Sequence, residues 1–336
     1  MPVAPPTRTS AASNRRSDAR PLLKWAGGKR QLLPVLRRLY PEQFGRYIEP
    51  FFGSGAVFFD LHARGAFERR TARLIDANLD LVGCYLALRR DIDSVIRALR
   101  VLDAGHRRTG DSHFYSVRDE RFNQLREPLL TEGDATRYTA ELAAMFIYLN
   151  RTGFNGLFRV NGRGRFNVPA GRYTNPTICD PEHLRWVARA LTSPNVAIEH
   201  ASFERGLDSA GAGDFVYCDP PYAPLTATAS FTSYTAAGFT SRDQERLQQA
   251  VLRAATRGAV VLVSNSNAAI VQDLYGSAVA QKAGFSVHRV PARRAINSRA
   301  SARGPVEELL ITNAAAPHLK KRQARRTSET LVRRTA

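Results

Sequence analysis

The sequence has few cysteines and no long apolar run, and these absences exclude whole classes of protein. The three cysteines among 336 residues, Cys84, Cys179 and Cys218, form no CxxC pair. We therefore predict neither a disulfide framework nor a metal site, and a reducing cytoplasm is the expected compartment. No apolar stretch approaches the roughly 18 residues of a membrane span, and the first residues have no hydrophobic core of a secretory signal.

Acidic residues are outnumbered, since 30 Asp and Glu stand against 49 Lys and Arg and leave a net charge of +19. Residues 1–20 carry four Arg and one Asp, and residues 315–336 carry seven Lys or Arg and one Glu, so the body at 21–314 keeps +10. We expect both ends to be disordered basic tails. A basic body favours a polyanionic partner, because neutralising phosphates releases counterions. The alternative is a generically basic protein with codon-driven Arg content.

Between the tails, short β-rich runs alternate with helical patterns. Strands are expected at YIEPFF (47–52), TARLIDAN (71–78), NVAIEHASF (195–203), DFVYCD (214–219), GAVVLVSNSN (258–267) and VEELLITN (306–313). Helices are expected at 56–64 and 79–91, and another begins with a capping box formed by Ser241 and Gln244. This order predicts an α/β fold with a doubly wound, mostly parallel sheet.

The stretch 81–182 interrupts the alternation, because it is mostly helical and carries its own polar loop. We therefore expect two domains. One is formed by 21–80 together with 183–314, and the other is an inserted helical domain at 81–182.

The segment YIEPFFGSG (47–55) places two glycines directly after the first expected strand. Gly53 and Gly55 allow a ligand to approach the backbone at the carboxyl end of that strand, where open α/β sheets bind ligands. The GxGxxG and Walker motifs are both absent. Asp76 ends the second strand, where its carboxylate can accept both ribose hydroxyls of a nucleoside. The alternative is that Asp76 only caps the next helix.

The segment DFVYCDPPYAPL (214–225) ends a strand with two prolines, which fix the chain in an extended turn. The turn presents the Asp219 carboxylate and the Pro220 carbonyl. Two such acceptors can bind the N–H groups of an aromatic amine and favour a pyramidal nitrogen with an available lone pair. Tyr222 offers a ring on which an extruded base can stack. The alternative is a purely structural Pro-Pro turn.

Two further segments carry aromatic and basic residues. In LLKWAGGKRQLL (22–33), Trp25 can attract a sulfonium through its ring, and Lys29 can pair with a carboxylate or a phosphate. A helix-capping loop with a buried Trp is the alternative. Residues 151–173 hold five arginines, interleaved aromatics and no acid, a composition that suits contacts with phosphates and base edges.

Three motifs in this order, KWAGGK (24–29), EPFFGSG (49–55) and DPPY (219–222), resemble the DNA adenine-N6 methyltransferases of the D12 class, in their alpha group. LNRTGFNGL (149–157), RGRFNVPAGRY (163–173) and VYCDPPYAPLTATASF (216–231) resemble the Dam-type GATC methylases in particular. The likeness covers roughly 21–313. NSRASARG (297–304) matches the family's Ser/Gly/Arg segment only loosely.

The resemblance implies a class I S-adenosylmethionine-dependent fold with a seven-stranded sheet whose last strand is antiparallel. It implies that the methyl donor S-adenosylmethionine contacts Trp25, Lys29, Gly53, Gly55, Asp76 and Asp219. It assigns catalysis to Asp219, Pro220 and Tyr222. It assigns DNA contacts to Lys24, Asn155, Leu157, Arg159 and Pro169, with Arg159 as the reader of a guanine.

The predicted function is transfer of a methyl group to a flipped adenine in double-stranded DNA, within GATC, by a monomer acting on prokaryotic or phage DNA. The enzyme is either a solitary methylase or half of a restriction–modification pair. The alternative from another class is a catalytically idle DNA-binding protein on a methyltransferase scaffold. RNA methylation is disfavoured by the arginine-rich loop, and amino-cytosine methylation by Asp219, where such enzymes more often carry Ser.

Overall fold

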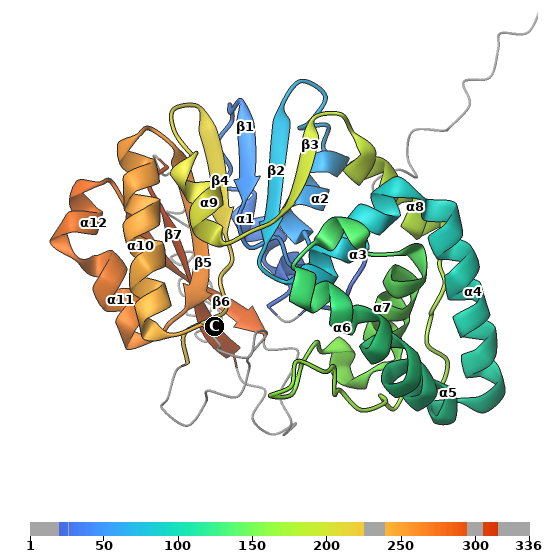
Figure 1. The fold of residues 1–336 in the computed structure, drawn as a ribbon. Coiled ribbons are helices and arrows are strands. Elements are labelled where there is room, and N and C mark those ends of the chain that lie inside the picture. Colours follow the sequence, from blue (N-terminus) through green and yellow to red (C-terminus); the bar gives the residue numbers. More distant parts are fainter. Residues whose placement is uncertain (1–19, 26, 225–238, 294–304, 315–336) are drawn as a thin grey trace, which may run out of the picture.

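The computed structural model describes residues 20–25, 27–224, 239–293 and 305–314. Among these residues, seven strands form one sheet in the order β3-β2-β1-β4-β5-β7-β6 (Figure 1). The strands are β1 (Arg46–Glu49), β2 (Thr71–Asp76), β3 (Val196–His200), β4 (Asp214–Cys218), β5 (Val260–Ser266), β6 (Ser286–Arg293) and β7 (Pro305–Thr312). Strands β1 to β5 pair in parallel, and β7 is antiparallel to both β5 and β6. The expected mostly parallel sheet with an antiparallel last strand is confirmed.

Helices cover both faces of the sheet, because successive strand residues point to opposite faces. Tyr47 packs in one buried cluster and its neighbour Ile48 in the other. The helices α1 (Leu33–Leu36), α2 (Ala56–Ala63), α3 (Leu79–Arg90) and α8 (Pro181–Thr192) contribute to the first cluster. The helices α9 (Phe203–Asp208), α10 (Ser241–Thr256), α11 (Ala269–Gly276) and α12 (Ala278–Lys282) contribute to the second. β4, buried at every residue, lies between these two layers.

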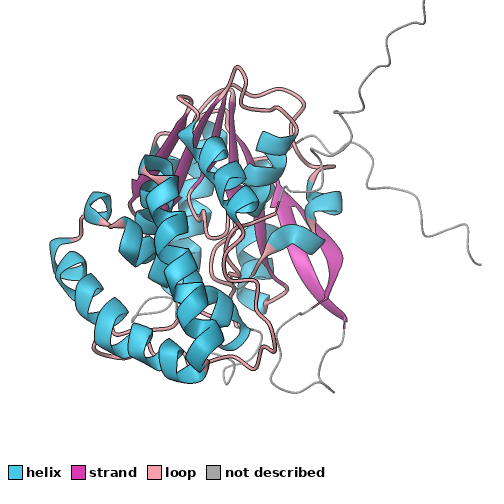
Figure 2. Cartoon of the chain, turned by 90° about the vertical axis from the view of Figure 1, so that its right-hand side faces the viewer, coloured by secondary structure: helices cyan, strands magenta, loops and turns pink. Residues whose placement is uncertain are grey.

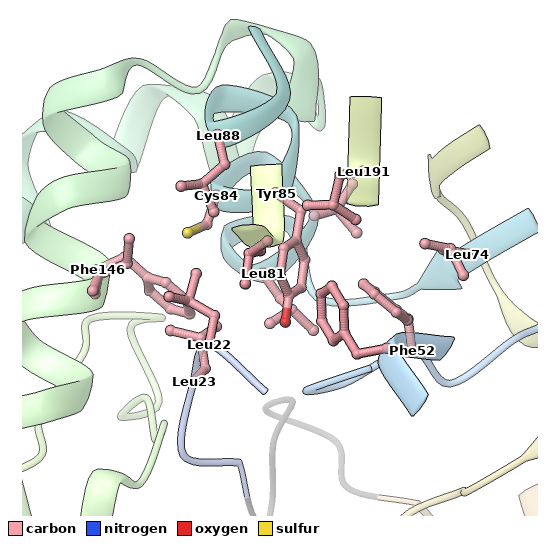
Figure 3. Packing of buried hydrophobic residues seen from close by; sticks show 14 of the residues in the cluster. Leu22, Leu23, Phe52, Leu74, Leu81, Cys84, Tyr85, Leu88, Phe146 and Leu191 are labelled. Atoms are coloured by element: carbon pink, nitrogen blue, oxygen red, sulfur yellow. The ribbon is translucent and has the colours of Figure 1, made fainter. Parts of the chain in front are cut away.

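A group of helices extends beyond the β3 side of the sheet (Figures 1 and 2). It comprises α4 (Ile92–Thr109), α5 (Asp111–Ser116), the π-helix η2 (Val117–Phe122), α6 (Asn123–Glu132) and α7 (Ala140–Thr152). The first buried cluster runs without a break from the sheet through α3 into this group. Figure 3 shows it passing from Leu74 and Phe52 through Tyr85 and Leu81 to Phe146. The helical group is therefore packed firmly on the sheet through α3.

After α7 the chain forms a hairpin that we call the arginine hairpin (residues 157–169). A bridge pairs Val160 with Phe166, and a second bridge pairs Gly153 with Ala170 at its base. Short 3-10 turns at Lys29–Gln31, Ala135–Arg137 and Phe154–Gly156 complete the elements. No described helix is both long and apolar enough to cross a bilayer.

Two local features differ from the expectations. The helix α10 begins one residue earlier than its predicted box, because Thr240 and Asp243 make the reciprocal bonds and Gln244 is buried instead. The edge strand β6 was not predicted, since SVHRVPAR mixes polar residues with Pro291; an edge strand tolerates proline. Of the expected tails, Arg20 pairs with Asp180, and the rest lies outside the described residues, as does 297–304.

Candidate active site

Three carboxylates gather at the carboxyl ends of adjacent strands. Glu49 ends β1, Asp76 ends β2, and Asp219 directly follows β4. The chain runs from β1 outward through β2 to β3, and from β4 outward to β5, so the strand order reverses between β1 and β4. Open α/β sheets bind their ligands at such a switch point. The fold thus brings Gly53, Gly55, Asp76 and Asp219 to one edge of the sheet.

The loop after β1 is shaped around its glycines. Gly53 and Gly55 have φ of 49° and 68°, and a Cβ on Gly55 would lie 2.5 Å from the Phe52 ring. Tyr85 reaches past Phe52 and donates a hydrogen bond to the Gly53 carbonyl, at 3.2 Å (Figure 3). The Gly53 amide donates to Asp76 Oδ2 at 2.9 Å. The glycine loop and the second strand are therefore joined through Asp76.

Asp76 retains the capacity to bind a diol. Its Oδ1 accepts the Asn78 amide at 2.9 Å, and a carboxylate oxygen has a second lone pair beyond each of these bonds. Burial raises the pKa of Asp76, and the amides of Gly53 and Asn78 oppose that rise. The N-cap of α3 is Asn78, which accepts from Leu81, so Asp76 is not the cap of that helix. The donor and acceptor pattern fits the two hydroxyls of a ribose.

Asp219 forms an ion pair with Lys29, whose Nζ lies 2.8 Å from Asp219 Oδ1. The Lys29 side chain is 3% exposed and also donates to the Gly27 carbonyl, and its Nζ lies 4.6 Å from the centre of the Tyr222 ring. Burial raises the pKa of Asp219 to about 6, against the lowering effect of Lys29. Since a fifth of the Asp219 side chain is exposed, the carboxylate remains accessible to a ligand.

The turn after Asp219 is held by residues that the sequence analysis missed. The Tyr222 hydroxyl donates to Glu308 of β7 at 2.5 Å. Gln244 donates to the carbonyl of Pro221 at 3.1 Å, and Asn265 of β5 donates to Gln244 at 2.9 Å. Pro220 is buried at the centre of this turn. The turn is thus a fixed part of the fold.

Glu49 was also missed. It is 2% exposed and accepts the Tyr47 hydroxyl at 2.8 Å. Burial raises its pKa well above the ordinary value, and the charges of Asp219 and Asp76 raise it further. The sequence signal that could have identified Glu49 is a carboxylate inside an apolar strand, directly before Pro50. Across the described ranges, no three His, Cys, Asp or Glu side chains gather as a ligand set for a metal.

Lys24 and Trp25 lie between the glycine loop and the arginine hairpin. The Asn150 side chain bonds both backbone groups of Lys24, at 2.9 and 2.7 Å. Trp25 stacks on Phe158 of the hairpin with ring centres 5.8 Å apart, and its ring lies 3.1 Å from the position of a Cβ on Gly53. Two adjacent residues, expected to contact DNA and cofactor respectively, therefore join the two loops.

The expected DNA-contacting residues lie together around the hairpin. Arg159, Asn155 and Pro169 are exposed, and Leu157 is half-buried. Arg159 donates to the side chain of Asn167 across the hairpin, at 2.9 Å. The Phe154 amide donates to the Pro169 carbonyl at 2.9 Å, and a Cβ on Gly156 would lie 2.4 Å from Lys24 Cβ. Lys24 and the loop before the hairpin are thus in direct contact.

Comparisons with known proteins identify the family of this chain. The family model of the D12 class N6 adenine-specific DNA methyltransferases matches residues 25–296. The type II methyltransferase M1.LlaDCHI of Lactococcus lactis subsp. cremoris is 36% identical over 301 residues, covering 88% of this chain and 96% of that protein. M.MjaIII, a type II methyltransferase of Methanocaldococcus jannaschii, is 38% identical over 310 residues, covering 88% and 99%.

A third relative is the DNA adenine methylase of Escherichia coli strain K12, which is 35% identical over 292 residues, covering 87% of this chain and 94% of that protein. All three relatives are matched along nearly their whole length. The chain therefore belongs to the D12 class of N6 adenine-specific DNA methyltransferases, enzymes that take their methyl group from S-adenosylmethionine.

Proposed function

We propose that this enzyme methylates the N6 atom of an adenine flipped out of double-stranded DNA, within the sequence GATC. The observation that carries the proposal is the turn Asp219–Tyr222, with an ion-paired carboxylate and an anchored aromatic ring at the switch point of the sheet. Relatives named DNA adenine methylase support the choice of base. GATC follows from the resemblance of the arginine-rich loop to that of the Dam-type enzymes.

In this proposal Asp219 and the Pro220 carbonyl accept the two N–H groups of the adenine amine. The nitrogen lone pair, released from conjugation, attacks the methyl carbon in line as the carbon–sulfur bond breaks. S-adenosylmethionine supplies that methyl on a sulfonium, a good leaving group. The nitrogen then loses a proton, for which the nearby Asp219 carboxylate is a suitable acceptor. Tyr222 stacks on the flipped base, a contact worth about 1–3 kcal/mol.

The cofactor is proposed to lie over the glycine loop, with its ribose on Asp76 and its backbone close to Gly53 and Gly55. Trp25 faces the sulfonium, and Lys29 pairs with the cofactor carboxylate or with Asp219. The donors and acceptors of this edge support that arrangement, because the hydrogen bonds to the Asp76 carboxylate come from backbone amides and leave it able to accept a further donor, and the Lys29 ammonium is buried.

The helical stretch 81–182 is proposed as the target-recognition domain, inserted in the catalytic domain at 21–80 and 183–314. Arg159 reads a guanine through its two-pronged guanidinium, and Lys24 contacts the outer base pair. Asn155, Leu157 and Pro169 complete the contact surface. The enzyme is proposed to act as a monomer on prokaryotic or phage DNA, without a metal.

The test is transfer of radiolabelled methyl to two duplexes, one with GATC and one with that site scrambled, followed by nucleoside digestion. Label on N6-methyladenine from the GATC duplex alone is the expected result. Label in both duplexes refutes the GATC assignment. Label in neither, with S-adenosylmethionine and DNA both bound, favours the idle DNA-binding protein.

Two variants link the result to the proposed site. Asp219→Ala should reduce transfer at least 100-fold and leave DNA affinity within about twofold, because it removes an acceptor for the amine. Asp208→Ala, at an exposed position at the end of α9, is the matched control and should retain full activity. Normal turnover by Asp219→Ala would refute the mechanism.

A further inference from the structure

We propose that Arg118, Asn123 and Arg126 hold the arginine hairpin in a fixed register and thereby act as positioning residues for target choice. The inference rests on the proposed function, since it assumes that the hairpin reads DNA. All three residues come from one helical segment, in the part that runs from the π-helix η2 into α6.

Each of these side chains bonds the backbone of one arm of the hairpin. Arg118 donates to the Val168 carbonyl at 2.9 Å, and Arg126 donates to the Gly164 carbonyl at 2.5 Å. Between them, Asn123 donates to the carbonyl of Phe166 at 3.0 Å and accepts its amide at 2.8 Å. The carbonyls at 166 and 168 are alternate carbonyls of an extended arm and therefore point to the same side, and the carbonyl at 164 belongs to Gly164, which ends the turn with φ of 73°. The helix thus supplies the hydrogen bonds that a neighbouring strand would supply.

The other edge of the same arm pairs with the first arm of the hairpin. The Asn167 amide donates to the Arg159 carbonyl at 3.1 Å, and the Asn161 amide donates to the Arg165 carbonyl at 2.9 Å. An isolated two-stranded hairpin is only marginally stable in water, and a third partner is needed for independent order. The three helix side chains provide that third partner, so the backbone of Arg159 is ordered before DNA binds.

The spacing of the three residues depends on the π-helix. Arg118 and Asn123 are five apart, which is the span of one π-helical i to i+5 hydrogen bond, and the Asn123 amide makes that bond to the Arg118 carbonyl. Arg126 follows three residues later, on the same face of an ordinary α-helix. The π turn therefore lines up three side chains along the second arm of the hairpin and the end of its turn.

Burial and charge fix the far end of this arrangement. Arg126 and Asp80 are each 3% exposed and form a two-pronged ion pair, with distances of 2.9 and 2.6 Å. Asp80 lies in the first turn of α3 and also accepts the Tyr138 hydroxyl at 3.2 Å. The guanidinium is thereby immobilised, and its remaining nitrogen is directed at the Gly164 carbonyl near the hairpin tip. Asn123, at 2% exposed, is equally confined.

The test compares Asn123→Ala with Gln124→Ala, the same change at the adjacent, exposed amide. Both are assayed for kcat/KM on a GATC duplex and on three duplexes with one base pair of the site replaced. Asn123→Ala loses two backbone hydrogen bonds, so its preference for GATC should fall about tenfold. Its kcat at saturating GATC duplex and its Kd for S-adenosylmethionine should stay within about twofold of the parent. Gln124→Ala should match the parent throughout.

Arg126→Lys is the second variant, because an ammonium can keep an ion pair with Asp80 but cannot also reach the Gly164 carbonyl as the third guanidinium nitrogen does. It should remain folded, by its thermal melting, and lose about threefold in preference. If the variants fold and keep the parental preference for GATC, the inference is wrong and the proposed function is unaffected. Parallel losses of kcat and cofactor affinity also overturn it, since they indicate a general structural role. A parent enzyme with no preference among the four duplexes overturns the GATC proposal and this inference together.

Discussion

From the ion pair between Lys29 and Asp219 we predict how the rate of the reaction depends on pH. The pKa of Asp219 is about 6, raised by burial and held down by Lys29. An ionised carboxylate is the better acceptor for the adenine amine, so activity should fall as the pH drops through about 6. At pH 5 roughly a tenth of Asp219 is ionised, and kcat/KM should be about tenfold below its plateau.

Lys29→Met tests the cause of this pKa, because it removes the cation and keeps most of the side-chain volume. The charges lie 2.8 Å apart, and Coulomb's law gives an attraction of about 1.5 kcal/mol even at the dielectric constant of water. That energy corresponds to about one pKa unit, and a partly buried pair reaches about 1–3 units. The sign is upward, since loss of a positive neighbour disfavours the carboxylate. The acid limb should move to about pH 7 or above.

The assay is kcat/KM between pH 5 and 9 with S-adenosylmethionine and DNA both far below saturation, because this ratio then reports ionisations of the free enzyme. Each profile is scaled to its own plateau, so a loss of cofactor affinity in the variant does not obscure the midpoint. Lys282→Met, at an exposed position in α12, is the control and should keep the parental midpoint. An unchanged midpoint in Lys29→Met would refute the reasoning, as would an acid limb that persists in residual activity of Asp219→Asn.

Three other predictions concern single side chains of the site. Asp76→Ala should weaken S-adenosylmethionine binding at least 100-fold by calorimetry, because it removes two charged acceptor contacts, while DNA affinity stays unchanged; a smaller effect would place the ribose elsewhere. Arg159→Ala should cost about 1–3 kcal/mol of discrimination at one guanine in competition assays; equal weakening on all sequences would make it a phosphate contact. Tyr222→Phe keeps the stacking ring and loses the bond to Glu308, so its kcat should fall about threefold to tenfold, and the kcat of Glu308→Gln should fall less. If Tyr222→Phe loses as much kcat as Tyr222→Ala, the hydroxyl has a direct role in the reaction.

Six of the seven described strands were predictable because each contains a short apolar run. β4 and β5 are covered on both faces, and such strands leave an unbroken hydrophobic signal in the sequence. β6 has no such signal, since it lies at the edge of the sheet and accommodates His288, Arg289 and Pro291. The start of α10 was misplaced by one residue because Thr240–Asp243 and Ser241–Gln244 both fit a capping-box spacing.

The residues of the candidate site were predictable where one motif contains them, and not where a contact spans the chain. Asp219, Pro220 and Tyr222 are adjacent in the sequence. Their anchors are distant, since Glu308 lies 86 residues after Tyr222, and periodicity carries no information about such a pair. Gln244 was assigned to a helix cap, and only the packing of α10 beside β5 reveals that it holds the turn instead.

Trp25 limits how mutations in this enzyme can be interpreted. Its ring stacks on Phe158 of the arginine hairpin and also approaches Gly53 of the glycine loop. Replacing Trp25 removes one wall from each loop, so lost activity cannot by itself be assigned to cofactor binding or to DNA recognition. Phe158→Leu changes the hairpin side of this stack and leaves Trp25 beside Gly53. If Phe158→Leu loses target preference but keeps its Kd for S-adenosylmethionine, DNA recognition and cofactor binding are separable at Trp25. If the variant loses both, the two functions are coupled through Trp25.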